Sequence, residues 1–366
     1  MTPPVFLLGE AWGQHEASIR AGFVGPSGVH LLRMLSDAGA IELSQADRGL
    51  IHRFYSEENP SLIDAVWRNH PEFHRTNVFN QRPPGNVLEE FCGIREEGIA
   101  GYPAILPSKY VRSAYQHELD RLGDELLSLN PNLVVCLGNT ALWAMFGRTG
   151  ITKLRGTTVV STHCVSGFKL LSTYHPAAVI RQPSIRPTTV ADLGKISTER
   201  LSPSINRPAC EVWIEPTVAD IEEFYEQRIR GCDLLSTDIE TAGNQVTCIG
   251  FAPSSQSAIV IPFHDERQAD GNYWRDAGDE RNAWGIVRRI LVDPSIPKLF
   301  QNGLYDIAFL LRSVGIAVRG ATHDTMLLHH ALQPESLKGL GYLGSLYSNH
   351  GPWKSERRIA TIKRDE

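Results

Sequence analysis

Long hydrophobic runs and paired cysteines are both missing from this 366-residue chain. No apolar stretch approaches the roughly 18–20 residues that a membrane-spanning helix requires. The first residues, MTPPVFLLGEAWGQ, lack the basic start and the cleavage site of a signal peptide. We therefore expect a soluble, cytoplasmic protein with no membrane partner. The six cysteines form no C-x-x-C pair, which indicates reduced thiols rather than a disulfide framework or a zinc knuckle.

A surplus of positive charge is missing as well, because the net charge is −5. Residues 1–200 are balanced in charge, so the deficit lies entirely in the second half of the chain. Bulk charge therefore does not favour binding to nucleic acid, and any phosphate contact depends on local Lys and Arg side chains. An acidic second half is consistent with carboxylates that bind metal ions, and equally with an ordinary solvated surface.

The chain is long enough for two domains, since single cores stop growing at roughly 250–300 residues. Apolar runs at 4–9 and 132–138, with helical periodicity over 108–129 before the second run, predict an α/β fold with parallel strands. The Pro- and Ser-containing stretch 197–216 predicts a connector between domains.

Strands are predicted after the connector at 234–239, 245–251 and 258–262, with helices at 218–230 and 280–291. This order predicts a second α/β domain with a mixed sheet. The predicted domains are therefore residues 1–200 and 213–366, joined by a linker at 201–212.

Four short motifs in the first domain combine glycine, an aromatic ring and polar side chains. Gly9–Gly13 follows a predicted strand, and its glycines allow backbone amides to approach a ligand closely. Phe23 lies among glycines and offers a flat face for stacking on a base. Asn77 carries a donor and an acceptor side by side, and His175 adds an imidazole after another predicted strand. Each motif alone is typical of a structural role.

Together, and in this order, the motifs resemble the uracil-DNA glycosylase superfamily, in particular its family-4 type, over about residues 5–195. The resemblance implies a three-layer α/β/α fold with a parallel central sheet. It also implies hydrolysis of the N-glycosidic bond of uracil in DNA, with the base flipped into a pocket. The residues that it assigns are Glu10 and His175 for catalysis, Gly9, Ala11, Phe23 and Asn77 for uracil, and Arg181 and Arg186 for DNA.

The resemblance also implies a role for each side chain. Glu10 positions or activates water, Phe23 stacks on the flipped base, and Asn77 reads the O4 and N3–H edge of uracil. His175 stabilises the negative charge that develops on the departing base, which is worth about 3–4 kcal/mol for one well-placed donor.

Three features depart from the family pattern. Trp12 stands where the family usually has proline. Of the four cysteines that bind the family's iron–sulfur cluster, only Cys92 remains, and Gln81 occupies another of these positions. We therefore expect no iron–sulfur cluster. The segment Ile41–His74 is longer than its family counterpart, and the sequence assigns it no role.

The second domain carries acidic motifs with a different spacing. Asp238 and Glu240 are two apart on a predicted strand and so point to one face, where two carboxylates repel unless a cation lies between them. Asp306 follows Asn302 at the start of a predicted helix, and Asp324 begins a later segment.

These motifs resemble the DEDD superfamily of 3′–5′ exonucleases, most closely the proofreading domain of phage family A DNA polymerases, over about residues 210–350. The resemblance implies a ribonuclease-H-like fold in which Asp238, Glu240 and Asp306 bind two Mg²⁺ or Mn²⁺ ions. It places Asn302 near the terminal nucleotide, and Asp324 is interpreted as structural. Asp365 is the one later aspartate available as a fourth ligand, without the Tyr or His that the family has four residues earlier.

The sequence thus predicts an enzyme that excises uracil and trims 3′ ends of single-stranded or duplex DNA. A phage origin would place it in the cytosol of the bacterial host, acting beside a DNA polymerase on a separate chain. Two alternatives stay open. In the first, the chain is a glycosylase whose exonuclease-like domain binds DNA or a polymerase without cutting DNA. In the second, both domains are non-catalytic and form a replisome interaction protein.

Overall fold

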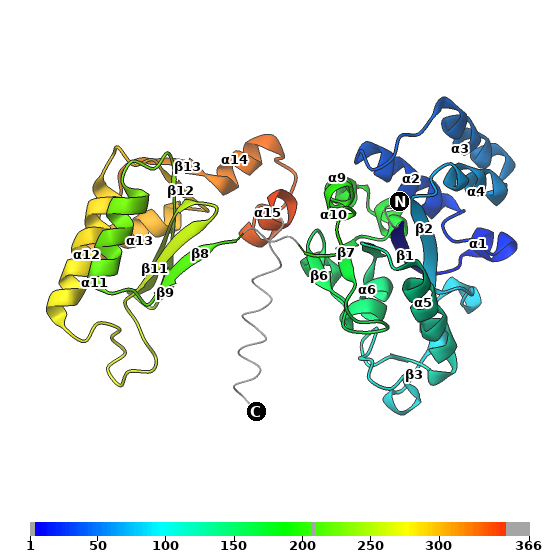
Figure 1. Cartoon of the computed structure of the whole chain (residues 1–366), viewed down its shortest axis with the longest axis horizontal. Coiled ribbons are helices and arrows are strands. Elements are labelled where there is room, and N and C mark those ends of the chain that lie inside the picture. Colours follow the sequence, from blue (N-terminus) through cyan, green and yellow to red (C-terminus); the bar gives the residue numbers. More distant parts are fainter. Residues whose placement is uncertain (1–3, 206–208, 349–366) are drawn as a thin grey trace. The chain divides into compact units, whose positions relative to one another are not determined.

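The structure is a computed structural model that describes residues 4–205 and 209–348. It contains two compact units (Figure 1). Unit 1 comprises Met1–Asn206 and the segment that begins at Gly344, and unit 2 comprises Arg207–Leu343. No helix within the described ranges is long and apolar enough to cross a membrane. The predicted domain boundaries at residues 200 and 213 stay a prediction.

Unit 1 is built on a five-stranded sheet in the order β2-β1-β5-β7-β6. Four strands are parallel, and β6 joins the edge antiparallel to β7. The strands are β1 (Val5–Ala11), β2 (Phe73–Phe79), β5 (Val134–Leu137), β6 (Thr158–Val160) and β7 (Lys169–Thr173). Because parallel strands end at the same edge, the loops after β1, β2, β5 and β7 meet there.

Helices cover both faces of this sheet. Alternate residues of β1 point to opposite sides, so Val5 and Leu7 enter one core and Phe6 and Leu8 the other. The first core contains the helices α2 (Pro26–Asp37), α8 (Pro176–Arg181), α9 (Arg186–Gly194) and α10 (Ile196–Glu199). The second contains α5 (Gln116–Leu129) and α6 (Asn139–Phe146). The predicted three-layer α/β/α fold is confirmed.

A helical hairpin adds to the first core. It consists of α3 (Gln45–Glu57) and α4 (Pro60–Arg68), and it fills the segment whose role the sequence did not show. The hairpin buries Ile51, Phe54, Ile63, Val66 and Trp67. Short elements complete the unit: α1 (Gln14–Ile19), α7 (Ile151–Leu154), the strand pair β3 (Cys92–Gly93) and β4 (Tyr110–Val111), and the 3₁₀ turns Pro84–Asn86, Leu88–Phe91, Arg95–Glu97, Ser113–Tyr115 and Pro183–Ile185.

The prediction of a helix over 108–129 is wrong for residues 108–115. Tyr110 pairs with Gly93 as part of the β3–β4 ribbon, and Ser108 has a positive φ of 56°. Helix α5 therefore starts at Gln116. Pairing with a distant strand overrides the local helical period here.

Unit 2 contains a six-stranded mixed sheet in the order β13-β12-β9-β10-β11-β8. Strands β9, β10 and β11 are antiparallel neighbours, whereas β12 lies parallel to β9 and β13 parallel to β12. The strands are β8 (Glu211–Ile214), β9 (Leu235–Ala242), β10 (Gln245–Ser254), β11 (Ser257–Pro262), β12 (Lys298–Phe300) and β13 (Ala321–Asp324). The predicted mixed sheet of a ribonuclease-H-like fold is confirmed.

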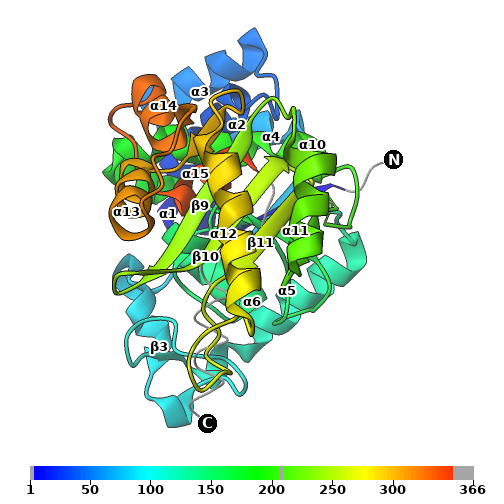
Figure 2. The same cartoon turned by 90° about the vertical axis from the view of Figure 1, so that its left-hand side faces the viewer.

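Two helices cover one face of this sheet, α11 (Val218–Phe224), extended by a π-helical turn at Tyr225–Ile229, and α12 (Ala277–Val292). Figure 2 shows both in front of β9, β10 and β11. Leu235 and Ile239 of β9 pack into the core that these helices share, so Ser236, Asp238 and Glu240, which alternate with them, face the opposite side. The other helices of unit 2 are α13 (Leu304–Val314) and α14 (Thr325–Leu332), and α15 (Leu340–Tyr347) spans the boundary between the two units at Gly344.

Candidate functional site

Gly9 and Asn77 lie directly opposite each other where β1 and β2 end. A Cβ at position 9 would lie 2.2 Å from Asn77 Oδ1 and 2.6 Å from Phe23 Cζ. The Asn77 amide and the tip of the Phe23 ring therefore both rest against the Cα of Gly9. Since nothing larger than hydrogen fits there, the glycine allows these two side chains to meet.

Phe23 lies in the loop 20–25, between α1 and α2. Its φ of +54° is in the left-handed region, which is unusual for an aromatic residue. The ring is buried, and its centroid lies 6.1 Å from that of the His175 ring. The structure thus brings together Gly9, Phe23, Asn77 and His175, from segments up to 166 residues apart in sequence.

The backbone of Asn77 is held from behind by polar side chains. Arg121 donates through Nη2 to the carbonyls of Asn77 at 2.7 Å and Val78 at 3.1 Å. Asn80 Oδ1 accepts from Asn77 N at 3.3 Å. Asn77 itself is 3% exposed, yet its side-chain amide forms no hydrogen bond with any other residue that the structure describes. A side-chain amide without a protein partner, on a residue that is otherwise buried, is suited to a ligand.

His175 precedes helix α8 and caps it. Its Nδ1 accepts from Ala177 N at 3.2 Å, which leaves the ring proton on Nε2 when the imidazole is neutral. Burial, together with the positive charge of Arg181, lowers the pKa of His175 to about 4. At neutral pH, His175 is therefore an uncharged donor.

Glu10 follows Gly9 on β1 and is oriented by α6. Thr140 Oγ1, in the first turn of that helix, donates to Glu10 Oε2 at 2.6 Å. Thr140 is buried, whereas Glu10 is partly exposed. Ala11 ends the strand opposite Phe79 and is also partly exposed.

The two predicted DNA-contacting arginines differ in their surroundings. Arg181, at the end of α8, is exposed and has no ion pair or hydrogen bond with another described residue. Arg186, at the start of α9, forms an ion pair with Asp37 of α2. Arg181 is thus free to contact phosphate, whereas Arg186 has an intramolecular partner.

Glu16, which is not among the predicted site residues, supports the loop 20–25. This carboxylate, on α1, is 8% exposed and accepts from Val24 N at 3.2 Å and Gly25 N at 3.0 Å. It also lies against Gly13, where a Cβ would be 2.7 Å from Oε2. The sequence feature that could have indicated this role is the position of the glutamate between two glycine-rich motifs.

The cysteines of unit 1 do not fit an iron–sulfur cluster. Unit 1 has three, one short of the four such a cluster needs: Cys92 on β3, Cys136 on β5 and Cys164 in the loop before β7. Burial raises the pKa of all three thiols, which disfavours the thiolate needed for ligation. Gln81 lies after β2, and its Nε2 is buried without a hydrogen-bond partner among the residues that the structure describes.

In unit 2, the acidic residues meet at β9. Asp238 and Glu240 are exposed on the face opposite α11 and α12, as their spacing predicted. Asp306, in the first turn of α13, accepts from the backbone N of Ile239 at 3.2 Å. Burial and the negative charge of Asp238 raise the pKa of Asp306 to about 6. This repulsion between neighbouring carboxylates is what a bound cation relieves.

The donor set is incomplete within the described ranges. No three His, Cys, Asp or Glu side chains in residues 4–205 and 209–348 are gathered closely enough to hold one metal ion. Asp365 lies outside the described residues. Mg²⁺ is commonly bound through one or two carboxylates together with substrate phosphates, so the pair Asp238 and Asp306 still suits such an ion.

Asp324 has a structural role, as its position suggested. Its carboxylate accepts from the backbone N of Asn302 at 3.1 Å and of Gly303 at 2.8 Å. It also caps α14 by accepting from Met326 N at 2.8 Å. Asn302 has a φ of +60°, so Asp324 stabilises a strained turn just before Asp306.

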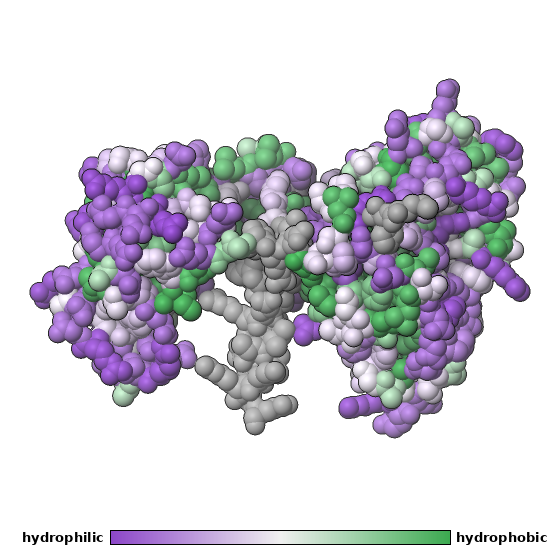
Figure 3. Space-filling view, in the orientation of Figure 1, coloured by the Kyte–Doolittle hydropathy of each residue, from purple (hydrophilic) through white to green (hydrophobic). Residues whose placement is uncertain are grey.

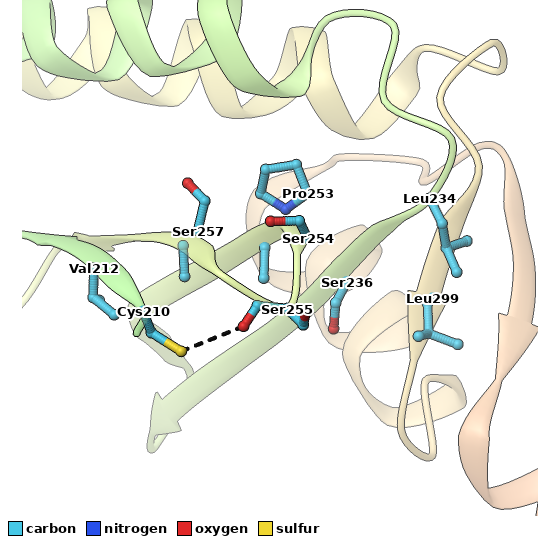
Figure 4. Close-up of a pocket in the computed structure, with 11 residues that line it drawn as sticks. Cys210, Val212, Leu234, Ser236, Pro253, Ser254, Ser255, Ser257 and Leu299 are labelled. Atoms are coloured by element: carbon cyan, nitrogen blue, oxygen red, sulfur yellow. Dashed lines mark hydrogen bonds between the residues drawn. The ribbon is translucent and has the colours of Figure 1, made fainter. Parts of the chain in front are cut away.

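A pocket of about 530 Å³ opens at the other end of β9 (Figure 4). Leu234 and Ser236 line it together with Leu299 of β12 and Val212 of β8. Cys210 Sγ lies 3.3 Å from the Ser255 carbonyl at its edge. None of the lining residues is charged, so the pocket is distinct in chemistry from the carboxylate pair.

Exposed leucines gather over α14 (Figure 3). Leu327, Leu328 and Leu332 are 61%, 50% and 74% exposed. Apolar side chains grouped in this way on a surface are typical of a contact with another macromolecule.

The chain matches two family models in agreement with these two sites. The model of the uracil DNA glycosylase superfamily matches residues 1–194, more than half of the chain. The model of a 3′–5′ exonuclease found in type A DNA polymerases matches residues 217–358.

Individual relatives resemble one or both parts. The DNA polymerase of Bacillus phage SP01 is 24% identical over 274 residues, which covers 68% of this chain and 28% of the polymerase. A type-4 uracil-DNA glycosylase of Archaeoglobus fulgidus is 24% identical over 201 residues, covering 52% of this chain and 74% of that enzyme. Among solved structures, the EXD2 exonuclease domain soaked in Mn is 19% identical with a TM-score of 0.26, covering 34% of this chain and 58% of that one.

The match to the phage polymerase covers 68% of this chain, which is too long to lie within either family match alone, so it includes part of both domains. This chain spans little more than a quarter of that polymerase. It belongs to the uracil DNA glycosylase superfamily and carries a 3′–5′ exonuclease domain after its glycosylase domain.

Proposed function

We propose that unit 1 hydrolyses the N-glycosidic bond of uracil in DNA, with the base turned out of the strand and held against Gly9. The observation that carries this proposal is Asn77, which is 3% exposed and whose side-chain amide has no hydrogen-bond partner among the described residues. The family match and the type-4 relative support it.

Asn77 would select the base through its two amide atoms. Uracil presents O4 as an acceptor beside N3–H as a donor, which pairs with Nδ2–H and Oδ1 of asparagine. Cytosine presents a donor beside an acceptor at the same positions and leaves one or both atoms unpaired. A buried polar atom without a partner costs about 1–3 kcal/mol, which favours uracil.

His175 would stabilise the leaving group. Cleavage places negative charge on uracil, and a fixed donor at the O2 carbonyl lowers the free energy of that transition state. Because the pKa of His175 is about 4, its Nε2–H donates from a neutral ring and needs no proton uptake. Glu10, held by Thr140, would orient the attacking water.

Phe23 and Arg181 would hold the substrate in place. The Phe23 ring beside Gly9 gives a flipped base a stacking surface, and Arg181, which is exposed and has no ion pair within the described residues, offers its charge to a phosphate. Arg186 is less suited to contact phosphate, because its guanidinium forms an ion pair with Asp37.

For unit 2, we propose 3′–5′ exonuclease activity that uses Asp238, Glu240 and Asp306 to hold Mg²⁺ or Mn²⁺. Such ions, when bound, activate water and stabilise the leaving 3′ oxygen. The electrostatic coupling of Asp306 to Asp238 supports the site, and the EXD2 exonuclease domain was studied with Mn. Asp365 stays a proposed fourth ligand. Asn302, on its strained turn, would lie near the terminal nucleotide.

A second function for unit 2 is binding without cleavage, to DNA or to a separate DNA polymerase. Two observations favour it: no complete metal-binding group occurs within residues 4–205 and 209–348, and leucines are exposed on α14. The phage polymerase, in which related domains share one chain with further sequence, also supports a polymerase partner.

The test uses 5′-labelled single-stranded DNA with one uracil, incubated with the full chain and then treated with alkali. Cleavage at uracil alone, unaffected by EDTA and lost in Asn77→Ala, supports the glycosylase. The matched control is Asn132→Ala, because Asn132 lies at the opposite end of the sheet and donates to the Arg200 carbonyl. Cleavage that persists in Asn77→Ala would overturn the assignment of that residue.

The same assay tests unit 2. A ladder of shortened products that needs Mg²⁺ or Mn²⁺ and is lost in Asp238→Ala supports the exonuclease. Asp279→Ala is the control, since Asp279 is exposed on α12 at the covered face of the sheet. The absence of any ladder, with DNA binding retained, would favour the binding function.

A further inference from the structure

The position of Phe23 is not determined by its own loop. A φ of +54° costs free energy for any residue with a side chain, and such a conformation persists only where neighbouring groups hold it. Besides Glu16, the groups that hold this loop include a side chain of the α3–α4 hairpin.

Trp67 of α4 holds the Phe23 backbone directly. Its Nε1 donates to the Phe23 carbonyl at 2.9 Å, and Trp67 is 3% exposed. On another side of the same carbonyl lies Gly28, where a Cβ would be only 1.7 Å from the oxygen. The carbonyl is therefore confined between the indole N–H and the backbone of α2.

Arg75 of β2 extends the support to the preceding residue. Its Nη1 donates to the Gly22 carbonyl at 2.7 Å, and its guanidinium lies 5.6 Å from the centre of the Trp67 ring. Asp64, also on α4, forms an ion pair with Arg75. One turn of α4 thus supplies Trp67, which holds residue 23, and Asp64, which orients the Arg75 side chain that holds residue 22.

We propose that the α3–α4 hairpin positions the Phe23 ring for stacking on the extruded base, with Trp67 as the positioning residue. The inference rests on the proposed uracil-excision activity and gives the segment Ile41–His74 a role in it. The Trp67 N–H acts through Phe23, because it donates to the Phe23 carbonyl.

The experiment compares Trp67→Phe with Trp143→Phe in the full chain. Both changes remove a buried indole N–H that donates to a backbone carbonyl, because Trp143 Nε1 donates to the Pro103 carbonyl at 2.8 Å. The readouts are KM and kcat for a uracil-containing oligonucleotide and inhibition by free uracil. We expect Trp67→Phe to raise KM and the inhibition constant roughly five- to tenfold, with a smaller change in kcat, because stacking contributes to binding. Trp143→Phe should leave both constants within about twofold of the wild-type values.

A double variant tests whether Trp67 acts through Phe23. In the Phe23→Ala background, Trp67→Phe should cause no further loss of uracil binding, because there is no ring left to position. Additive losses, or equal effects of Trp67→Phe and Trp143→Phe, would overturn the proposal.

If Trp67→Phe does not fold, Arg75→Lys is measured instead, and a KM unchanged from wild type would then count against the proposal. A wild-type protein that neither excises nor binds uracil would contradict the proposed function instead.

Discussion

Asn77 Oδ1 lies against the Cα of Gly9, in the space that a Cβ at position 9 would take. The first prediction follows from this contact. Gly9→Ala should displace both the Asn77 amide and the Phe23 ring and lower uracil excision by about 100-fold or more, the usual effect of losing one fixed transition-state donor. Gly194→Ala is the control, since a Cβ there makes only ordinary contact with the Ala38 carbonyl, at 3.7 Å. Near-normal excision by folded Gly9→Ala would show that the amide is not used.

The second prediction concerns the protonation of His175. Its pKa of about 4 lies below the ordinary value of 6.5, so the unfolded chain takes up this proton first as the pH falls. The contribution of His175 to stability is therefore complete above pH 6.5, declines between about 6.5 and 4, and is absent below. An NMR titration should give a midpoint near 4 for the His175 ring.

A stability comparison checks the same point. The difference in unfolding free energy between wild type and His175→Gln should become less favourable to the wild type as the pH falls from 6.5 to 4. Taking this difference removes the effect of other groups, such as Asp306, whose raised pKa acts in the opposite direction. A ring that titrates near 6.5 would contradict the prediction.

The third prediction tests the orientation of Glu10. Thr140→Val removes the hydroxyl that donates to Glu10 Oε2 but keeps the side-chain volume nearly unchanged. We expect kcat for uracil excision to fall about three- to tenfold with little change in KM, because one hydrogen bond that orients a reacting group is lost. Thr140→Ser retains the hydroxyl and should retain most of the activity. A loss of equal size in both variants would assign the effect to packing instead.

The fourth prediction separates the two arginines. Arg181→Ala should weaken DNA binding and reduce the slope of log affinity against log salt by about one unit, as expected for one lost phosphate contact. Arg186→Ala should have a smaller effect on this slope, because its guanidinium is paired with Asp37. Binding titrations at several salt concentrations measure both slopes. An equal or larger change for Arg186→Ala would reverse the assignment.

The fifth prediction concerns Asp324. Asp324→Ala removes an acceptor from the turn at Asn302 and Gly303 and from the start of α14, and should destabilise unit 2 by about 2–3 kcal/mol. Asp276→Ala is the matched control, because Asp276 caps α12 by accepting from Gly278 and Asp279. Both variants should lower the melting temperature, but only Asp324→Ala should also impair the trimming of 3′ ends. Unchanged trimming would show that the turn is not part of that site.

Local patterns predicted much of both domains correctly. The alternation of β9 placed Asp238 and Glu240 on one face, and the apolar run at β1 placed Gly9 and Glu10 at the end of a strand. These predictions succeeded because side-chain direction along a strand is fixed by its period of two. The start of α5 was mispredicted because Tyr110 pairs with a strand 17 residues earlier, and local periodicity carries no information about such pairing.

The sequence by itself determined the residue types of the site, the strand ends that carry them and the two-domain order. Only the tertiary structure showed that Trp67 holds Phe23, that Arg121 holds Asn77, that Arg186 is paired with Asp37, and that Asp306 reaches the backbone of Ile239. Each of these contacts joins residues 44 or more positions apart. Such contacts depend on how whole elements pack, and no short-range pattern in the chain encodes that packing.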